Sequence, residues 1–194
     1  MLDSVESDGR QLSELTWTEI GTAGEHLFCA RVILTGGGDL ELYRPVSDED
    51  HTDVVAGRKG RAPNLAIQVK TCRDVDKNGL LEAATTFQAG EPRDDPALVY
   101  AVLYVPELDI DRAWLIPSHA FNSLAYRTVK KDGRLALNLR IHLNHADAAN
   151  PYEVDTADLG PRLMSFVGAS RPSPHDPPPS GSVFLFLNPS PAPY

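Results

Sequence analysis

The sequence predicts an α/β domain in which a mixed central β-sheet is flanked by helices. Three patterns support this fold class. Apolar residues recur at helical spacing over residues 20–34, residues 40–71 read as three successive strands, and residues 97–105 form an almost continuous apolar run, typical of a strand buried on both faces. At 194 residues with 42% hydrophobic content, the chain can bury one sizeable core.

The first predicted element is a helix. Its apolar positions alternate steps of three and four residues, which is the spacing of one helical face: Ile20, Ala23, Leu27, Ala30 and Leu34. Ser13 or Thr18 can supply the N-cap, and the glycines at 36–38 end the helix. Gly21 and Gly24 each cost about 1 kcal/mol relative to alanine inside a helix, so they indicate close approach by another part of the backbone.

The later elements follow from alternation and turn residues. Strands are expected at 40–43, 53–57 and 65–71 as a meander, and then at 97–105, 112–116 and 135–143, the last as an edge strand. Short helices are expected at 80–87 and 119–126. The folded domain should span residues 12–168, between a flexible arm at 1–11 and a proline-rich, disordered tail at 169–194. Trp17 and Trp114 are expected in the core.

The strand at 65–71 contains an unusual pair of polar residues. Alternate residues of a strand point to opposite faces, so its leucine, isoleucine and valine should enter the core while Gln68 and Lys70 share the other face. A lysine in the middle of a central strand needs a carboxylate, a phosphate or a metal site to offset its charge. Asp53, which closes the acidic stretch 47–53, is the candidate companion.

The order of Glu25 in the first helix, Asp53 at the second strand and Gln68-Val69-Lys70 in the third resembles the PD-(D/E)xK nuclease superfamily, with a QxK variant of its motif. This is the restriction-endonuclease-like fold, which archaeal Holliday-junction resolvases share. The resembling stretch runs from about residue 15 to residue 118, and its motifs are GTAGE at 21–25, DHTD at 50–53 and QVKT at 68–71.

The resemblance implies a three-layer core with the order α-β-β-β-α-β and a metal-dependent endonuclease that hydrolyses DNA phosphodiester bonds. It implies that the Asp53 carboxylate binds Mg²⁺ (or Mn²⁺), that Glu25 completes or orients the metal site, and that Lys70 lies near the attacking water. The residue types suit this chemistry, because Mg²⁺ is held by oxygen ligands that include only one or two carboxylates.

Gln68 stands where this family usually has an acidic residue. Its amide oxygen can coordinate a hard cation but brings no negative charge, so metal affinity should fall unless Glu25 or Asp50 compensates. Two other interpretations stay open. Lys70 can simply pair with Asp53 across the sheet, or the protein can be a catalytically inactive nuclease-fold module that binds nucleic acid or protein. A third function class is an adaptor whose proline-rich tail engages a protein partner.

The net charge of −9 argues against nonspecific coating of nucleic acid, but two local basic clusters are candidates for contacts with the DNA backbone, at low sequence specificity. The first is Arg58, Lys59 and Arg61, and the second is Arg127, Lys130, Lys131 and Arg134. Either cluster can instead be a solvated surface.

Other sequence features set further limits. Cys29 and Cys72 stand apart and are expected as buried reduced thiols. The chain has no apolar run of roughly 18 residues and no signal-peptide pattern at its start, so we expect a cytoplasmic protein without a membrane partner. His142 and His145 have an HxxH spacing, but on a strand they would face opposite ways and are expected as surface residues. The oligomeric state stays open, with a homodimer among the options.

Overall fold

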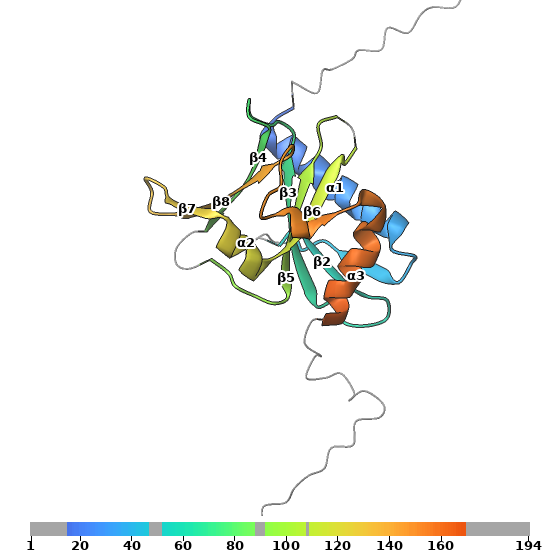
Figure 1. Ribbon diagram of the computed structural model, residues 1–194. Coiled ribbons are helices and arrows are strands. Elements are labelled where there is room, and N and C mark those ends of the chain that lie inside the picture. The colour runs from blue at the N-terminus through green and yellow to red at the C-terminus, as the bar shows by residue number, and fades with distance from the viewer. Residues whose placement is uncertain (1–14, 47–51, 88–91, 108, 170–194) are drawn as a thin grey trace, which may run out of the picture.

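The structure, a computed structural model, describes residues 15–46, 52–87, 92–107 and 109–169 (Figure 1). The predicted arm at 1–11 and residues 170–194 of the predicted tail lie outside the described residues. Among the residues that the structure describes, no helix combines the length and apolar character needed to cross a membrane.

The described residues form two β-sheets and three α-helices. Within them the larger sheet has six strands in the order β1-β2-β3-β5-β6-β9, and the smaller has three in the order β4-β8-β7. The strands are β1 (Leu40–Tyr43), β2 (Val54–Arg58), β3 (Leu65–Cys72), β4 (Leu80–Phe87), β5 (Leu98–Tyr104), β6 (Arg112–Pro117), β7 (Tyr126–Val129), β8 (Leu135–His142) and β9 (Glu153–Val154). The helices are α1 (Trp17–Thr35), α2 (Ser118–Leu124) and α3 (Leu159–Ala169), with 3₁₀ turns η2 (Asn150–Tyr152) and η3 (Thr156–Asp158).

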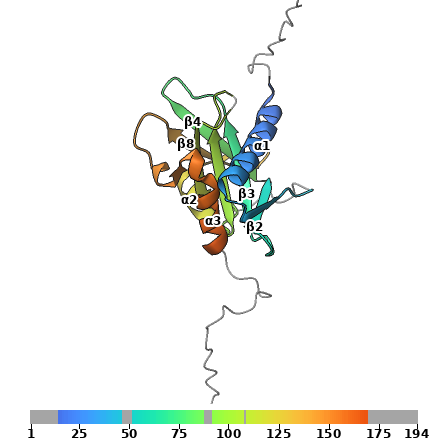
Figure 2. The same cartoon turned by 90° about the vertical axis from the view of Figure 1, so that its right-hand side faces the viewer.

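The elements form three layers, which confirms the predicted α/β class with a mixed central sheet. Helices α1 and α3 pack on one face of the six-stranded sheet, and the three-stranded sheet and α2 lie on the other (Figures 1 and 2). Each face has its own core. The first contains Phe28 and Val32 of α1, and the second contains Tyr100 and Trp114.

The predicted meander is present. β1 pairs antiparallel with β2, and β2 pairs antiparallel with β3, with Val54 opposite Ile67. β3 then pairs in parallel with β5, where Gln68 is in register with Tyr100, and β5 pairs antiparallel with β6. Between β3 and β5 the chain leaves this sheet and forms β4, so the smaller sheet lies directly over the strands that carry the predicted site.

The prediction of a helix at 80–87 is wrong, because this segment is the strand β4. Leu81, Ala83, Thr85 and Phe87 are buried in alternation, and all eight residues pair with β8. The spacing of the apolar residues fits a helix, but the adjacent β-branched Thr85 and Thr86 favour a strand. The helix–strand order implied by the resemblance therefore changes at this one element.

β8 was predicted as an edge strand, and this is also wrong. It lies between β4 and β7 and pairs with both, so it is the central strand of the smaller sheet. The basic residues next to it in the sequence favour an edge strand, but these residues belong to β7 and the following turn. The predicted short helix after β6 is confirmed as α2.

The long predicted helix is confirmed as α1, but its buried face differs from the predicted one. The buried residues recur every four positions as Ile20, Gly24, Phe28 and Val32. The N-cap is Thr16, which forms a capping box with Glu19, and not Ser13 or Thr18. Trp17 is 73% exposed, so its predicted core position is wrong, whereas Trp114 is fully buried as predicted.

Of the two helix glycines, only Gly24 marks a close approach. A Cβ atom at Gly24 would overlap the side chain of Thr71 on β3. At Gly21 a Cβ would have no neighbour within 4 Å among the described residues outside its own helix and chain neighbours. Gly24 therefore lets α1 lie directly on β3, and it fixes the position of the residue that follows it, Glu25.

Candidate active site

Asp53 lies immediately before β2 and is tied to β3 by two hydrogen bonds. Its backbone N–H donates to the carbonyl oxygen of Ile67 at 3.0 Å. Its carboxylate oxygen Oδ2 accepts a hydrogen bond from the backbone N–H of Val69 at 2.7 Å. Because Val69 stands between Gln68 and Lys70, these bonds place the carboxylate beside the strand segment that carries both polar residues.

Gln68 and Lys70 share one face of β3, as predicted. Leu65, Ile67 and Val69 belong to the core under α1 and α3, on the opposite face. Gln68 is only 3% exposed, and its amide oxygen Oε1 accepts a hydrogen bond from the hydroxyl of Thr85 at 3.3 Å. Lys70 is half-buried. The face is thus covered by β4 at Gln68 and partly open to solvent at Lys70.

The next residue on this face is Cys72, whose thiol donates to the carbonyl oxygen of Glu82 at 3.2 Å. Burial raises the pKa of this thiol to about 12, and the nearby positive charge of Lys70 opposes the shift. The thiol is therefore protonated at neutral pH, and it is no candidate for a nucleophile or a metal ligand.

Glu25 is positioned by α1, which packs on the opposite face of the sheet from Gln68 and Lys70. Its carboxylate forms an ion pair with Arg44, which follows β1, and the Arg44 guanidinium also lies 3.1 Å from Nε2 of His26. The Glu25 side chain is 21% exposed. The structure therefore gives Glu25 a cationic partner in the layer of α1 and β1. It places Asp53, Gln68 and Lys70 together where the start of β2 lies beside the middle of β3, which we call the β2–β3 junction.

The donor types at the β2–β3 junction suit a hard cation. Asp53 offers a carboxylate and Gln68 an amide oxygen, and Mg²⁺ typically uses one or two carboxylates and otherwise keeps waters or phosphate oxygens. In the parts of the chain that the structure describes, no three or more His, Cys, Asp or Glu side chains gather as a metal site. A Mg²⁺ site here would therefore depend on the Asp53 carboxylate and the neutral Gln68 oxygen, and the structure places the predicted second carboxylate, Glu25, in the layer of α1.

The first basic cluster, Arg58, Lys59 and Arg61, is exposed at the turn between β2 and β3. The turn is ordered by hydrogen bonds from the N–H of Lys59 to the Asp39 carbonyl oxygen at 2.8 Å and from the N–H of Arg61 to that of Arg58 at 2.9 Å. Asp53 is at the other end of β2, five residues of extended strand or roughly 16 Å from Arg58. The structure does not bring this cluster to the β2–β3 junction where Asp53 lies.

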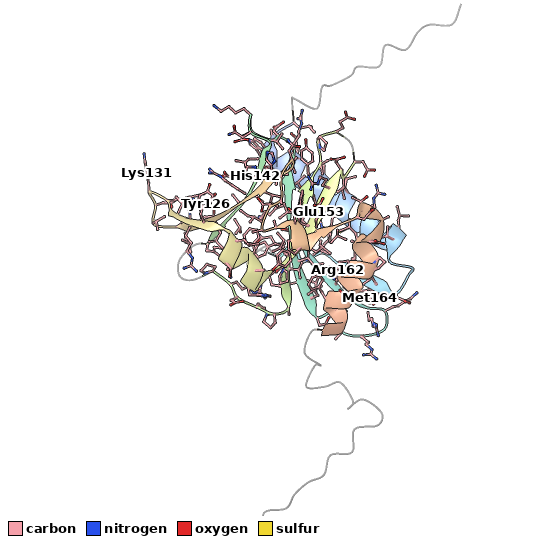
Figure 3. All side chains as sticks on the ribbon, in the orientation of Figure 1. Tyr126, Lys131, His142, Glu153, Arg162 and Met164 are labelled. Atoms are coloured by element: carbon pink, nitrogen blue, oxygen red, sulfur yellow. The ribbon has the colours of Figure 1, made fainter. Side chains whose placement is uncertain are left out.

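The second basic cluster lies on the β7–β8 hairpin. Arg127 is in β7, and Lys130, Lys131 and Arg134 are in the turn, all exposed. Figure 3 shows Lys131 at the tip of the hairpin, pointing away from the body of the protein. Arg134 forms an ion pair with Asp132 at 2.7 Å, so part of the positive charge of the turn is compensated locally.

Two residues that contact the predicted site residues were missing from the sequence-based prediction. Thr85 holds the amide of Gln68, and it was missed because 80–87 was predicted as a helix. Its β-branched neighbour Thr86 is the signal that favours a strand there. Arg44 pairs with Glu25, which lies 19 residues earlier in the sequence, and no local sequence pattern predicts such an ion pair.

The two histidines of the HxxH spacing face each other, contrary to the prediction. Their ring centroids are 5.9 Å apart in an edge-to-face arrangement, because β8 ends at His142 and the chain turns before His145. His142 is half-buried and His145 is exposed, and neither belongs to a metal cluster among the described residues.

Comparison with solved structures matches this fold to a bacterial homing endonuclease, I-Ssp6803I. The match covers 80% of this chain and 94% of that chain, with a TM-score of 0.54 and 14% sequence identity. The chain therefore shares the fold of that structure, which agrees with the predicted fold class. No protein-family profile matches the sequence, and no curated protein matches it.

Proposed function

We propose that this protein is a metal-dependent endonuclease that hydrolyses phosphodiester bonds of DNA. The observation that carries the proposal is the hydrogen bond from the Val69 N–H to the Asp53 carboxylate, which sets an acid beside Gln68 and Lys70 on adjacent strands. The same arrangement lies in a fold shared with a homing endonuclease.

In this proposal Asp53, Gln68 and Glu25 hold Mg²⁺ or Mn²⁺. The bound cation would polarise the scissile phosphate and make a water molecule more acidic. Asp53 is held by the hydrogen bond from the Val69 N–H, so its carboxylate is fixed beside β3. Glu25 would have to exchange its Arg44 partner for the cation, or act by orienting other ligands through that pair.

Lys70 has the catalytic role in this proposal. Its side chain is on the same face as the Gln68 amide, and the residue is half-buried, in surroundings where a charge acts more strongly than in bulk water. An ammonium in such a position stabilises the negative charge that develops on the phosphate oxygens and helps to orient the attacking water. We therefore expect its replacement to abolish cleavage and to leave DNA binding largely unchanged.

The proposed contacts to the DNA backbone come from the two basic clusters. Those on the β7–β8 hairpin are Arg127, Lys130, Lys131 and Arg134, and those at the β2–β3 turn are Arg58, Lys59 and Arg61. Cations of this kind bind phosphates without reading sequence. The net charge of −9 means that attraction to DNA has to come from such local clusters.

Nicking of supercoiled plasmid DNA in the presence of Mg²⁺ or Mn²⁺ tests the assignment. We expect Lys70→Ala and Asp53→Ala each to reduce the nicking rate by at least a hundredfold, since each removes a group that acts on the transition state. Asp158→Ala and Arg162→Ala remove exposed charges of the same signs elsewhere and serve as matched controls. Full activity in the Lys70 and Asp53 variants would refute the enzyme assignment.

Two observations favour a second candidate, a nuclease-fold module that binds DNA without cutting it. Gln68 supplies no charge, and the Glu25 carboxylate already has a cationic partner in Arg44. Calorimetric titration with Mg²⁺ separates the two candidates. An active site should bind the cation and lose that binding in Asp53→Asn, whereas an inactive module should show no heat of binding in either protein.

A further inference from the structure

The β7–β8 hairpin extends beyond the core that the rest of the smaller sheet covers. All four residues of β7 are exposed, and Val129 is 71% exposed although it is apolar. In the described part of the chain β7 pairs with β8 alone, so one of its edges is open. The hairpin projects sideways from the molecule in Figure 1. β7 exposes both of its faces, and with β8, whose Ala136 and Leu137 are buried, it forms a two-stranded ribbon with one accessible strand. Such a ribbon can enter a groove.

The turn at the end of this ribbon is ordered. The N–H of Lys130 donates to the carbonyl oxygen of Arg134 at 2.8 Å, and Gly133 adopts a φ of 81°, which favours glycine. Asp132 accepts hydrogen bonds from the backbone N–H and the guanidinium of Arg134, at 3.1 and 2.8 Å. Lys130 and Lys131 are therefore presented on a preorganised turn, so less conformational entropy is lost when a partner binds.

The outer face of the ribbon is polar. The register places Tyr126 opposite Asn138, and Thr128 opposite Ala136. The amide of Asn138 donates to the hydroxyl of Thr128 at 3.4 Å. Amide and hydroxyl groups can hydrogen-bond to the edges of bases, and asparagine can bind adenine with two hydrogen bonds. The ribbon therefore combines a basic tip with a face that can read bases.

One end of this face is held in a fixed arrangement. Arg140 lies over the ring of Tyr126, 4.8 Å from its centroid, and pairs with Glu82 at 2.9 Å. Tyr126 donates its hydroxyl hydrogen to the same carboxylate at 3.2 Å. These contacts link β7, β8 and β4, so the ribbon is rigidly joined to the strand that covers Gln68.

The strand register relates the ribbon to the proposed active site. Thr85, which contacts Gln68, is opposite Leu137, and Leu137 is opposite Arg127. Two strand spacings separate Thr85 from Arg127, roughly 10 Å. A B-form duplex has a major groove about 12 Å wide, which admits a two-stranded ribbon. Arg127 therefore lies within one groove width of the strand that covers Gln68.

We propose that the β7–β8 hairpin enters the major groove of double-stranded DNA. Lys130 and Lys131 contact phosphates at the sides of the groove, and Asn138 and Thr128 face the base edges. The inference rests on the proposed function for its choice of partner, and it adds that the substrate is duplex DNA and that binding has a base preference, where the sequence indicated phosphate contacts alone.

Fluorescence anisotropy with a 30-base-pair duplex in EDTA tests the phosphate contacts, because no hydrolysis occurs without a divalent metal. We expect Lys130→Ala with Lys131→Ala to weaken binding about tenfold near 0.1 M salt and to reduce the slope of log K against log salt by about 1.8. Arg162→Glu changes the net charge equally on α3, on the opposite side of the sheet, and should leave the slope unchanged. An equal effect of both changes would overturn the proposal.

Two further measurements test entry into the groove. Single-stranded DNA of the same length should bind at least tenfold more weakly than the duplex, and equal binding would contradict groove entry. Selection from random duplexes should give a base preference that is lost at one position in Asn138→Ala and kept in Arg162→Ala. A wild-type selection without any preference would refute base reading.

The failure of this proposal can be told apart from failure of the proposed function. If the nicking activity depends on Lys70 but the hairpin variants bind normally, the enzyme assignment stands and the ribbon does not bind DNA. If the hairpin variants lose duplex binding but Lys70→Ala has no effect on nicking, the ribbon inference stands and the active-site assignment fails.

Discussion

The hydroxyl of Thr85 donates a hydrogen bond to the amide oxygen of Gln68 at 3.3 Å, and the two residues belong to different sheets. In this contact the amide oxygen of Gln68 is the acceptor, and β4 supplies the donor. Both side chains are 3% exposed. The orientation of a proposed metal ligand is therefore set by a strand outside the central sheet.

Thr85→Val tests this contact, since it replaces the hydroxyl with a methyl group of similar size. We expect the free energy of unfolding to fall by about 1–2 kcal/mol, because a buried amide oxygen loses its donor. Urea unfolding measures the change. Thr85→Ser, which keeps the hydroxyl, should retain the Mg²⁺ affinity that Thr85→Val lowers, and equal Mg²⁺ affinities in the two variants would count against an orienting role.

Gln68→Glu tests the consequence of the neutral side chain. A carboxylate at this buried position should destabilise the metal-free protein by about 1–3 kcal/mol, because a charge replaces a neutral amide. The same charge should raise the affinity for Mg²⁺ about tenfold. Thermal unfolding with and without Mg²⁺ measures both effects. A variant that loses stability and gains no stabilisation from Mg²⁺ would argue against a metal at this position.

Gly24→Ala tests the close approach of α1 to β3. Because the added methyl group overlaps the Thr71 side chain, we expect a loss of about 1–3 kcal/mol in the free energy of unfolding. Gly21→Ala is the matched control within the same helix. Its Cβ has room, so the higher helix propensity of alanine should stabilise the protein by about 0.5–1 kcal/mol. Opposite signs for the two substitutions are the expected result in urea unfolding.

The Cys72 thiol predicts a loss of stability at alkaline pH. Its pKa is about 12 in the folded protein against 9.0 for an ordinary thiol, so the folded state binds more protons than the unfolded state between these values. Stability is therefore fully present below about pH 9 and falls as the pH rises toward 12, with a slope of up to about 1.4 kcal/mol per pH unit for this group. Cys72→Ala should show a smaller fall between pH 9 and pH 11 than wild type.

The pKa of the Tyr100 hydroxyl is raised in a similar way, so this group also contributes to the loss of stability at alkaline pH. Burial raises its pKa to about 12, so it also lowers stability as the pH rises from about 10. Cys72→Ala removes only the thiol contribution, and Tyr100→Phe removes the other. If neither variant flattens the decline, groups other than these two govern the alkaline unfolding.

The residues of the candidate site at the β2–β3 junction could be predicted from the sequence because the information is local. Alternation alone gives the common face of Gln68 and Lys70, and the meander brings the start of β2 beside β3, which places Asp53. The elements on either side were harder to predict. Glu25 could be assigned to α1, but its Arg44 partner depends on how the helix packs.

The errors in the fold have a common physical cause. The apolar spacing of β4 fits both a helix and a strand, and that of α1 fits more than one buried face. In both elements, contacts with other parts of the fold decide between the alternatives. β4 is a strand because β8 pairs with its whole length, and β8 comes much later in the sequence. In α1, Ala23 and Ala30 of the predicted stripe are exposed, because Gly24 allows the helix to lie closest to β3 along a different line.

The pairing of β4 with β8 also affects the time at which the chain can fold. Glu82 and Arg140, which face each other across this pair, are 58 residues apart. At a synthesis rate of about 5–20 residues per second, β4 is synthesised roughly 3–12 s before its partner strand β8. During that interval the nascent chain exposes an unpaired strand edge, so the second sheet is the stage of folding most open to aggregation and to help from chaperones.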